Sequence, residues 1–252
     1  MSIELTDPAL ILNLEDEDQL RPLPIGTPRY YLGVTAVNDS FVRQNLYKAA
    51  GRLRAQVYID EMGFLPHSER QADGTETDPD DARSIHLAVS ETLPGESDER
   101  VIGVTRLIQK RDETDTLPVE QLFNITSAPV GSLEVSRFIA RASDRKLQGR
   151  VSLALMRTAA LLGVESKAPK MYAVVEEPLF RYFQHIGLPF EPISELEWLD
   201  EYHSKNLAVQ IDPNNVIPAL QRKDKQRGSV AVAPFFVKEV SSKGIGHFGP
   251  EF

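Results

Sequence analysis

An apolar stripe along residues 42–57 limits what this chain can fold into more than any other feature. Its apolar residues recur at steps of four, three, four and four, which is the period of an amphipathic helix with one face on a core. Asp39 or Ser40 can cap the start of this helix, and Gly63 is placed to end it. The sequence therefore predicts a long helix early in the chain.

Short runs rich in β-forming residues surround this helix and predict a sheet. They lie at residues 30–36, 85–90, 101–108, 133–140, 171–175 and near 190, with further helices expected at 149–163 and 177–185. The polar segment between the second and third runs predicts a hairpin. This order predicts an α/β fold with a mixed, mostly antiparallel central sheet flanked by helices, not the regular alternation of a doubly wound sheet.

The two ends of the chain differ in composition from its middle. Residues 1–28 combine an acidic cluster with four prolines, so we expect an N-terminal arm or leader there. Residues 29–197 hold the periodic segments and are expected to form the main domain. Residues 198–252 are expected to be a C-terminal extension that packs on the domain or completes it, with an edge strand at 207–211 and a helix at 213–222.

Charge and cysteine content exclude several classes of function. The 28 basic against 37 acidic residues give a net charge of −9, which argues against general nucleic-acid binding. The absence of cysteine excludes disulfides, thiolate metal sites and cysteine-based acyl-enzyme chemistry. The first residues are acidic where a signal peptide would be basic, and no apolar run approaches the ~20 residues of a membrane helix. We expect a cytoplasmic protein without integral membrane association.

Charged side chains interrupt the apolar pattern at three places in the first half of the chain. Arg54 and Tyr58 lie one helical turn apart, although alone they are typical of a solvated arginine beside a half-buried tyrosine. Asp78 and Asp81 can converge on a cation or on a partner arginine, or can belong to a plain acidic loop. Arg106 lies inside an apolar strand and needs a partner there, which the acidic loop can supply, and a purely structural ion pair explains this equally well. The loop lacks the glycine and distal glutamate of an EF-hand, so we expect no metal.

A fourth interruption is the pair Glu134 and Arg137 in the strand at 133–138. With a period of two, their side chains should face opposite sides of the sheet. If both serve one cleft, the strand must contain a β-bulge or splay nearby. Such breaks in local pattern concentrate at functional sites.

A basic turn precedes the helix that we expect to begin at Gly149. The helix N-terminus and the surrounding cations can form a phosphate cradle, or the turn can simply be a solvated surface. Its residues are Arg141, Arg145, Lys146, Gly149 and Arg150. The five histidines show no metal-ligand spacing and no catalytic Ser/Asp partners.

Taken in order, four motifs resemble the acyl-homoserine-lactone synthases (autoinducer synthases) and the related N-acyl amino acid synthases of the GNAT acyltransferase superfamily. The resemblance covers roughly residues 30–195. The motifs are Arg54-Ala-Gln-Val-Tyr58 with Glu61-Met-Gly-Phe64, Glu76-Thr-Asp78-Pro-Asp-Asp81, Ile102-Gly-Val-Thr-Arg106-Leu, and Leu133-Glu134-Val-Ser136-Arg137-Phe138.

The resemblance implies a GNAT-like fold and an N-acyltransferase of quorum sensing. Such an enzyme moves a fatty acyl group from the phosphopantetheine thioester of acyl carrier protein to a small amine, with acyl-CoA as the alternative donor. In the homoserine-lactone synthases the amine belongs to S-adenosylmethionine, and lactonisation follows. A free amino acid is the alternative acceptor, and a non-catalytic acyl-binding module of the same fold is a further alternative. No permanently bound cofactor is implied.

The resemblance also assigns roles to residues of this sequence. Glu134 is the candidate catalytic base, and Arg137 orients the network of Asp78, Asp81 and Arg106. The implied substrate-binding residues are Arg54, Tyr58, Phe64, Asp78, Asp81, Arg106, Ser136 and Phe138. The basic residues at 141–150 would meet the acidic carrier protein. Tyr58, Phe64 and Leu133 depart from the phenylalanine, tryptophan and aromatic residue that the family usually has at these positions.

Overall fold

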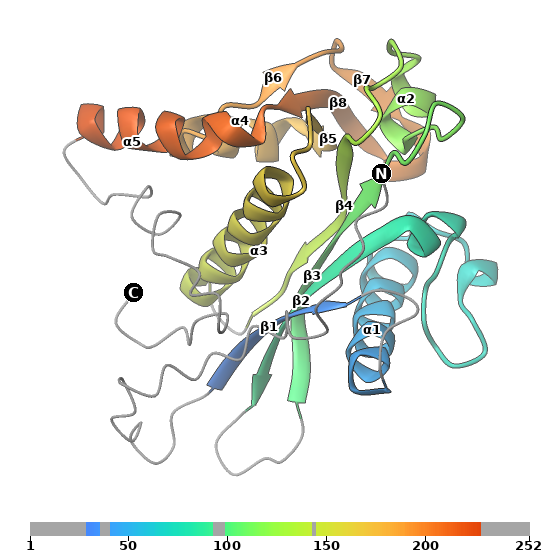
Figure 1. Ribbon diagram of the computed structural model, residues 1–252. Helices are drawn as coiled ribbons and strands as arrows, with labels where there is room; N and C mark the ends of the chain where they lie inside the picture. The colour runs from blue at the N-terminus through green and yellow to red at the C-terminus, as the bar shows by residue number, and fades with distance from the viewer. Residues whose placement is uncertain (1–28, 36–40, 93–98, 143–144, 228–252) are drawn as a thin grey trace. The chain divides into compact units, whose positions relative to one another are not determined.

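The structure is a computed structural model that describes residues 29–35, 41–92, 99–142 and 145–227 (Figure 1). The strands in these ranges are β1 (Arg29–Thr35), β2 (Ser84–Thr92), β3 (Glu99–Gln109), β4 (Leu133–Ala140), β5 (Met171–Glu176), β6 (Glu191–Pro192), β7 (Glu197–Leu199) and β8 (Ser204–Ile211). The α-helices are α1 (Phe41–Arg54), α2 (Pro118–Phe123), α3 (Arg145–Glu165), α4 (Glu177–Ile186) and α5 (Val216–Arg227). A π-helix, η2 (Ala55–Glu61), continues α1, and the short 3-10 helices are η3 (His67–Glu69), η4 (Pro79–Arg83), η5 (Asp200–Tyr202) and η6 (Pro213–Asn215).

The described chain divides into two compact units. Unit 1 contains residues 107–136 and 157–227, and unit 2 contains residues up to 106 together with 137–156. The strands β3 and β4 and the helix α3 each contribute residues to both units.

Unit 2 is built on the strands β1, β2, β3 and the second half of β4, in that order. β1 is antiparallel to β2 along its whole length, and α1 packs on both of them. The apolar stripe of α1 faces a core that includes Leu53, Ala88, Val104 and Ile139. At Gly103 a side chain would come within 2.4 Å of Val151 in α3, so glycine is what lets that helix approach β3.

Unit 1 is built on the first half of β4, then β5, β8 and β6. β4 is parallel to β5, which in turn is antiparallel to β8. Both β6 and β7 pair with β8 in antiparallel orientation. The core of this unit gathers Leu117, Val119 and Phe123 around α2 with Tyr172 and Ala208 from the sheet.

The predicted α/β class with a mixed, mostly antiparallel sheet is confirmed, and four details of the prediction are wrong. Residues 207–211 do not form an edge strand, because β8 has β5 on one side and β6 and β7 on the other, which suits its buried apolar run. α3 begins at Arg145 and not at Gly149, so the part of the basic turn from Arg145 onward forms the first turns of this helix. The short elements α2 and β7 were not predicted. The helix through residue 57 changes from α to π geometry at Ala55.

The expected cap at Asp39 or Ser40, the N-terminal arm and the end of the C-terminal extension lie outside the described residues. None of the helices in the described ranges combines the length and apolar character needed to cross a bilayer.

Candidate functional site

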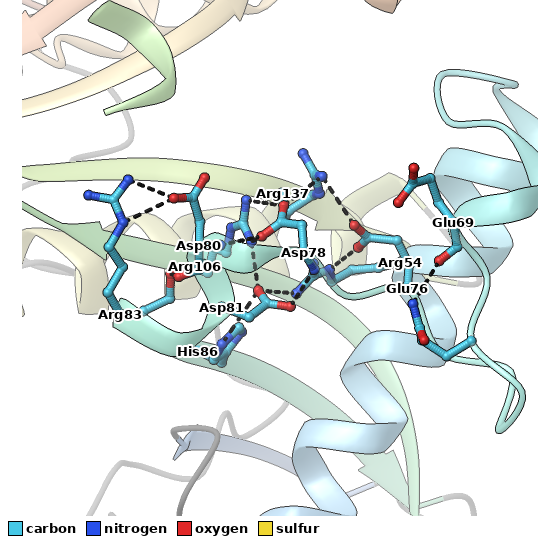
Figure 2. Close-up of polar contacts among 12 residues, drawn as sticks. Arg54, Glu69, Glu76, Asp78, Asp80, Asp81, Arg83, His86, Arg106 and Arg137 are labelled. Atoms are coloured by element: carbon cyan, nitrogen blue, oxygen red, sulfur yellow. Dashed lines mark hydrogen bonds and ion pairs between the residues drawn. The ribbon is translucent and has the colours of Figure 1, made fainter. Parts of the chain in front are cut away.

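Six charged side chains of unit 2 form one buried ion-pair network (Figure 2). They come from the end of α1, the segment before and within η4, β3 and β4, and their formal charges cancel. The three arginines are Arg54, Arg106 and Arg137, and the three carboxylates are Glu76, Asp78 and Asp81.

The carboxylates are positioned by a reciprocal cap at the start of η4. The Asp78 side chain accepts a hydrogen bond from the Asp80 N–H at 3.0 Å, and Asp81 Oδ2 accepts one from the Asp78 N–H at 3.3 Å. Pro79 follows at the first helical position, where its missing N–H costs nothing. The spacing of three between the two aspartates is therefore what turns both carboxylates to the arginines.

The acidic segment lies directly against α1. The Glu76 N–H donates to the Gly51 carbonyl at 3.0 Å. A side chain at Gly51 would lie 2.9 Å from the Thr75 Cβ, so glycine is needed for this close approach. This contact places Glu76 beside Arg54, which lies at the end of α1.

Arg106 is the centre of the network. Its two terminal nitrogens bind the two oxygens of Asp78, with Nη2 to Oδ2 at 2.7 Å, and Nη1 also binds Asp81 Oδ1 at 2.6 Å. Arg54 binds the same Asp81 oxygen at 2.9 Å and donates through Nε to Glu76. The prediction that the aspartates converge on arginines is confirmed, and a solvated Arg54 is excluded because its side chain is only 2% exposed.

These contacts fix the charge state of the site. Burial opposes ionisation of Asp81, but Arg54 and Arg106 outweigh it and hold its pKa well below the ordinary value. Burial also opposes ionisation of Asp78, but its bonds to Arg106 and the charge of Arg137 outweigh this effect and lower its pKa. Conversely, burial lowers the pKa of His86 to about 4, with Arg54 and Arg106 adding to the effect against the opposing charge of Asp81.

Arg137 differs from the other two arginines in backbone and exposure. Its φ is +54°, a left-handed conformation in the middle of β4 that is strained for a residue with a side chain. Its Nη2 binds Glu76 at 3.1 Å and Asp78 at 3.0 Å, and its side chain is 15% exposed. In Figure 2 its other terminal nitrogen points away from the carboxylates. The backbone of β4 is thus distorted at Arg137, while a β-bulge that brings Glu134 and Arg137 to one cleft stays a prediction.

An aromatic pair lies beside Arg137. The guanidinium carbon of Arg137 is 5.4 Å from the centroid of the Tyr58 ring, and Tyr58 stacks on Phe64 with centroids 6.1 Å apart. The Tyr58 hydroxyl donates to the Phe138 carbonyl at 3.4 Å. The sequence motif around residues 54–64 therefore does meet the motif at 133–138 within unit 2.

The first half of β4, residues 133–136, belongs to unit 1. Glu134 is 2% exposed, and its Oε2 accepts a hydrogen bond from the Val119 N–H at 2.9 Å. Ser136 is half-buried. The observed contact of Glu134 is with α2, and its role as a base stays a prediction.

The basic residues at 141–150 are only partly described. Arg141 forms an ion pair with Glu61, and both side chains are exposed. Arg145 is exposed and Gly149 is half-buried. The side chains of Lys146 and Arg150 lie outside the described part of the structure.

Sequence reasoning missed three side chains that complete the network. Glu76 was given no role although it stands in a quoted motif, yet it pairs with Arg54 and Arg137. The Tyr47 hydroxyl donates to Asp81 at 3.3 Å, and its ring meets His86 edge-on at 4.9 Å. The position of Glu76 inside the quoted motif was the available signal for it. Among the described residues, no group of three or more His, Asp or Glu side chains is arranged to hold a metal ion.

Comparison with known proteins identifies the fold that carries this site. Residues 53–155 match the family model of the GNAT acetyltransferase domain. A search of curated proteins found no match. Many solved structures are similar, although their sequences are distant.

Three of these structures define the similarity. The CoA-dependent acyl-homoserine lactone synthase BjaI, solved with SAM and isopentyl-CoA, is 18% identical over 79% of this chain and 90% of its own, with a TM-score of 0.58. The AHL synthase LasI is 19% identical over 81% and 97%, with a TM-score of 0.56. FeeM, an N-acyl amino acid synthase from uncultured soil microbes, is 12% identical over 77% and 95%, with a TM-score of 0.53. The chain therefore has the GNAT-type fold that acyl-homoserine lactone synthases and an N-acyl amino acid synthase share.

Proposed function

We propose that this protein is a cytoplasmic N-acyltransferase that makes an acyl-homoserine lactone, an autoinducer of quorum sensing, from an acyl thioester and S-adenosylmethionine. The observation that carries the proposal is the ion-pair network of unit 2, to which each of the four motifs contributes an arginine or a carboxylate, on a fold shared with such synthases. A chain that needed only the fold would have little use for a network with four buried charges, because buried ion pairs seldom add net stability.

The network supports acceptor binding through Arg137. Two carboxylates hold one end of its guanidinium, and the other terminal nitrogen points away from them. A guanidinium held in this way binds a carboxylate with good geometry. S-adenosylmethionine and free amino acids both carry an α-carboxylate next to the amine that is acylated, so Arg137 can orient either one.

The chemistry requires a neutral amine and a base. The amine nitrogen attacks the thioester carbonyl carbon, a C–N bond forms, the C–S bond breaks, and the departing sulfur leaves as a thiol after gaining a proton. The α-amino group has a pKa of about 7.7–8, so a carboxylate such as Glu134 can accept the proton that the amine loses, directly or through water. With S-adenosylmethionine, the α-carboxylate then displaces the sulfonium group as methylthioadenosine and closes the lactone.

For the donor, we propose acyl carrier protein, with acyl-CoA as the alternative. The basic residues around the start of α3, such as Arg141 and Arg145, would meet an acidic carrier protein, although the net charge of the whole chain is −9. The alternative is supported by the CoA-dependent synthase BjaI, which has the same fold.

A second acceptor has support of its own. FeeM shares the fold and makes N-acyl amino acids. The departures at Tyr58, Phe64 and Leu133 fall among the residues assigned to the pocket walls. An N-acyl amino acid synthase would keep the transfer step and omit the lactone closure.

Mass spectrometry of lipid extracts from a bacterium expressing the chain tests the proposal, beside a Glu134→Gln variant. Glutamine keeps an oxygen that can accept the Val119 N–H bond, so the variant should fold. Acyl-homoserine lactones in the wild type alone support the proposal, and acyl amino acids instead establish the second acceptor. Full activity of Glu134→Gln contradicts its role as base. No acylated product from folded protein, with donor binding retained, favours a non-catalytic acyl-binding module.

A further inference from the structure

We propose that Tyr58 is a positioning residue, which holds the strained Arg137 segment of β4 in the geometry that binds the acceptor. This inference rests on the proposed function for its kinetic consequence, and on the structure alone for its mechanical one. Both residues belong to unit 2.

The first step is the backbone of Arg137. A left-handed φ of +54° is unfavourable for arginine, so the surrounding structure must hold it in place. The bonds from Nη2 to Glu76 and Asp78 restrain only the tip of the side chain. A second restraint has to act nearer the backbone.

Tyr58 supplies this second restraint at two points. Its hydroxyl binds the carbonyl of Phe138, the residue directly after Arg137. The face of its ring attracts the Arg137 guanidinium, whose carbon lies 5.4 Å from the ring centroid. The Tyr58 side chain therefore contacts both the strained segment of β4 and the Arg137 guanidinium.

Tyr58 is itself held by unusual local structure. It lies in the seven-residue π-helix Ala55–Glu61, a geometry that is rare and frequently occurs at functional sites. Phe64, beyond the end of that helix, stacks on the ring. The π-helix turns Tyr58 to β4 while Arg54, at the end of α1, stays in the ion-pair network.

Two substitutions separate the contributions of ring and hydroxyl. Tyr58→Leu removes both, and we expect the KM for the acceptor to rise about 10-fold, since a partly desolvated cation–π contact is worth roughly that factor. Tyr58→Phe keeps the ring and should raise this KM only about 2- to 3-fold, because a 3.4 Å hydrogen bond is weak. The KM for the acyl donor should stay within about twofold in both variants.

A readout independent of activity tests the mechanical part. The Nε–H of Arg137 is buried and has no hydrogen-bond partner among the residues that the structure describes. Its NMR signal reports on the side chain, and the loss of that signal in Arg137→Lys identifies it. ¹⁵N relaxation should show this group ordered in the wild type and in Tyr58→Phe, and mobile in Tyr58→Leu. Tyr182→Leu, the same change on an exposed ring of α4, is the matched control and should alter neither readout.

The outcomes separate the two proposals. If no acyl transfer occurs in the wild type, the proposed function fails, while the relaxation data still test the positioning role. An ordered Arg137 signal in Tyr58→Leu overturns the positioning role. So does a Tyr58→Leu enzyme that loses stability with an unchanged acceptor KM, or a Tyr182→Leu variant that shows the same changes.

Discussion

Two clusters of buried charge, one in each unit, differ in how completely their donors are used. In unit 1 the Lys110 ammonium binds Glu120 at 2.8 Å and Ser127 at 2.7 Å. Glu120 also accepts the N–H groups of Leu117 and Ala128. In unit 2, by contrast, each of the network's arginines has one buried nitrogen without a hydrogen-bond partner in the described part of the chain.

We interpret this difference as one between charges used for structure in unit 1 and charges that the proposed function uses in unit 2. The Lys110 cluster joins β3 to the start of α2 and the segment that follows it, and its charged groups are at most 6% exposed. The network of unit 2 leaves Arg137 partly exposed and on a strained backbone. Unused buried donors and strained backbones cost free energy, and proteins keep them mostly where function requires them.

The largest expected effect on stability follows from removing Arg106, the centre of the network of unit 2. Arg106→Gln leaves Asp78 and Asp81 buried with one arginine fewer each, so the free energy of unfolding should fall by about 3–5 kcal/mol. Urea denaturation measures it. Arg181→Gln, which breaks the exposed pair with Glu177 on α4, is the control and should cost at most about 0.5 kcal/mol. Equal losses of unfolding free energy in the two variants would mean that the network contributes no more to stability than an exposed ion pair does.

A substitution in the Lys110 cluster of unit 1 should lower stability without lowering activity. Lys110→Met leaves the Glu120 carboxylate with two backbone donors, so we expect a loss of about 2–3 kcal/mol in urea denaturation. Activity per folded molecule should not change. Adding Glu120→Gln should recover part of the stability, because the buried charge is then gone. A double variant less stable than Lys110→Met would refute this explanation.

Acid should lower the stability of the fold around the network of unit 2 through protonation of His86. Its pKa is about 4 in the folded chain and about 6.5 in the unfolded one, so between these values the unfolded chain binds more protons. The free energy of unfolding should therefore fall as the pH falls from 6.5 to 4, by at most about 1.4 kcal/mol per unit. Below pH 4, protonation of Asp78 and Asp81, whose pKa values are lowered by the fold, adds further loss.

His86→Gln is the comparison for this pH dependence. Its curve between pH 6.5 and 4 should be flatter than that of the wild type, with the two measured by urea denaturation in the same buffers. Parallel curves would show that His86 does not carry the effect.

The smallest expected effect concerns the strain at Arg137. Arg137→Gly and Arg137→Ala both remove the guanidinium, but only glycine accepts a φ of +54° without cost. The glycine variant should therefore be the more stable by about 1 kcal/mol. If alanine were equal or better, the left-handed backbone would not be strained.

The fold and the network were largely predictable because their signals are local. The aspartate pair at a spacing of three and an arginine in an apolar strand each required a partner, and these requirements matched. The stripe and the short β-rich runs gave the helix α1 and the strands β1 to β5 closely.

What was not predictable depends on tertiary packing. The π geometry of Ala55–Glu61 leaves no mark in the apolar period, and a six-residue helix such as α2 gives too short a pattern. The burial of β8 follows from its pairing with β6 and β7, which are only two and three residues long. The contact of Glu134 with the Val119 N–H likewise joins residues that no sequence period relates.

The most direct test compares one residue from each cluster in the purified chain, with acyl thioester and S-adenosylmethionine or a free amino acid. Thiol release gives kcat/KM, and urea denaturation gives stability, for Arg137→Gln and Lys110→Met. We predict that Arg137→Gln loses about 100-fold or more in kcat/KM and little stability, because charge-assisted bonds to the acceptor are lost. Lys110→Met should lose stability and keep its kcat/KM. Full activity of Arg137→Gln, or equal losses of activity in the two variants, would contradict the account.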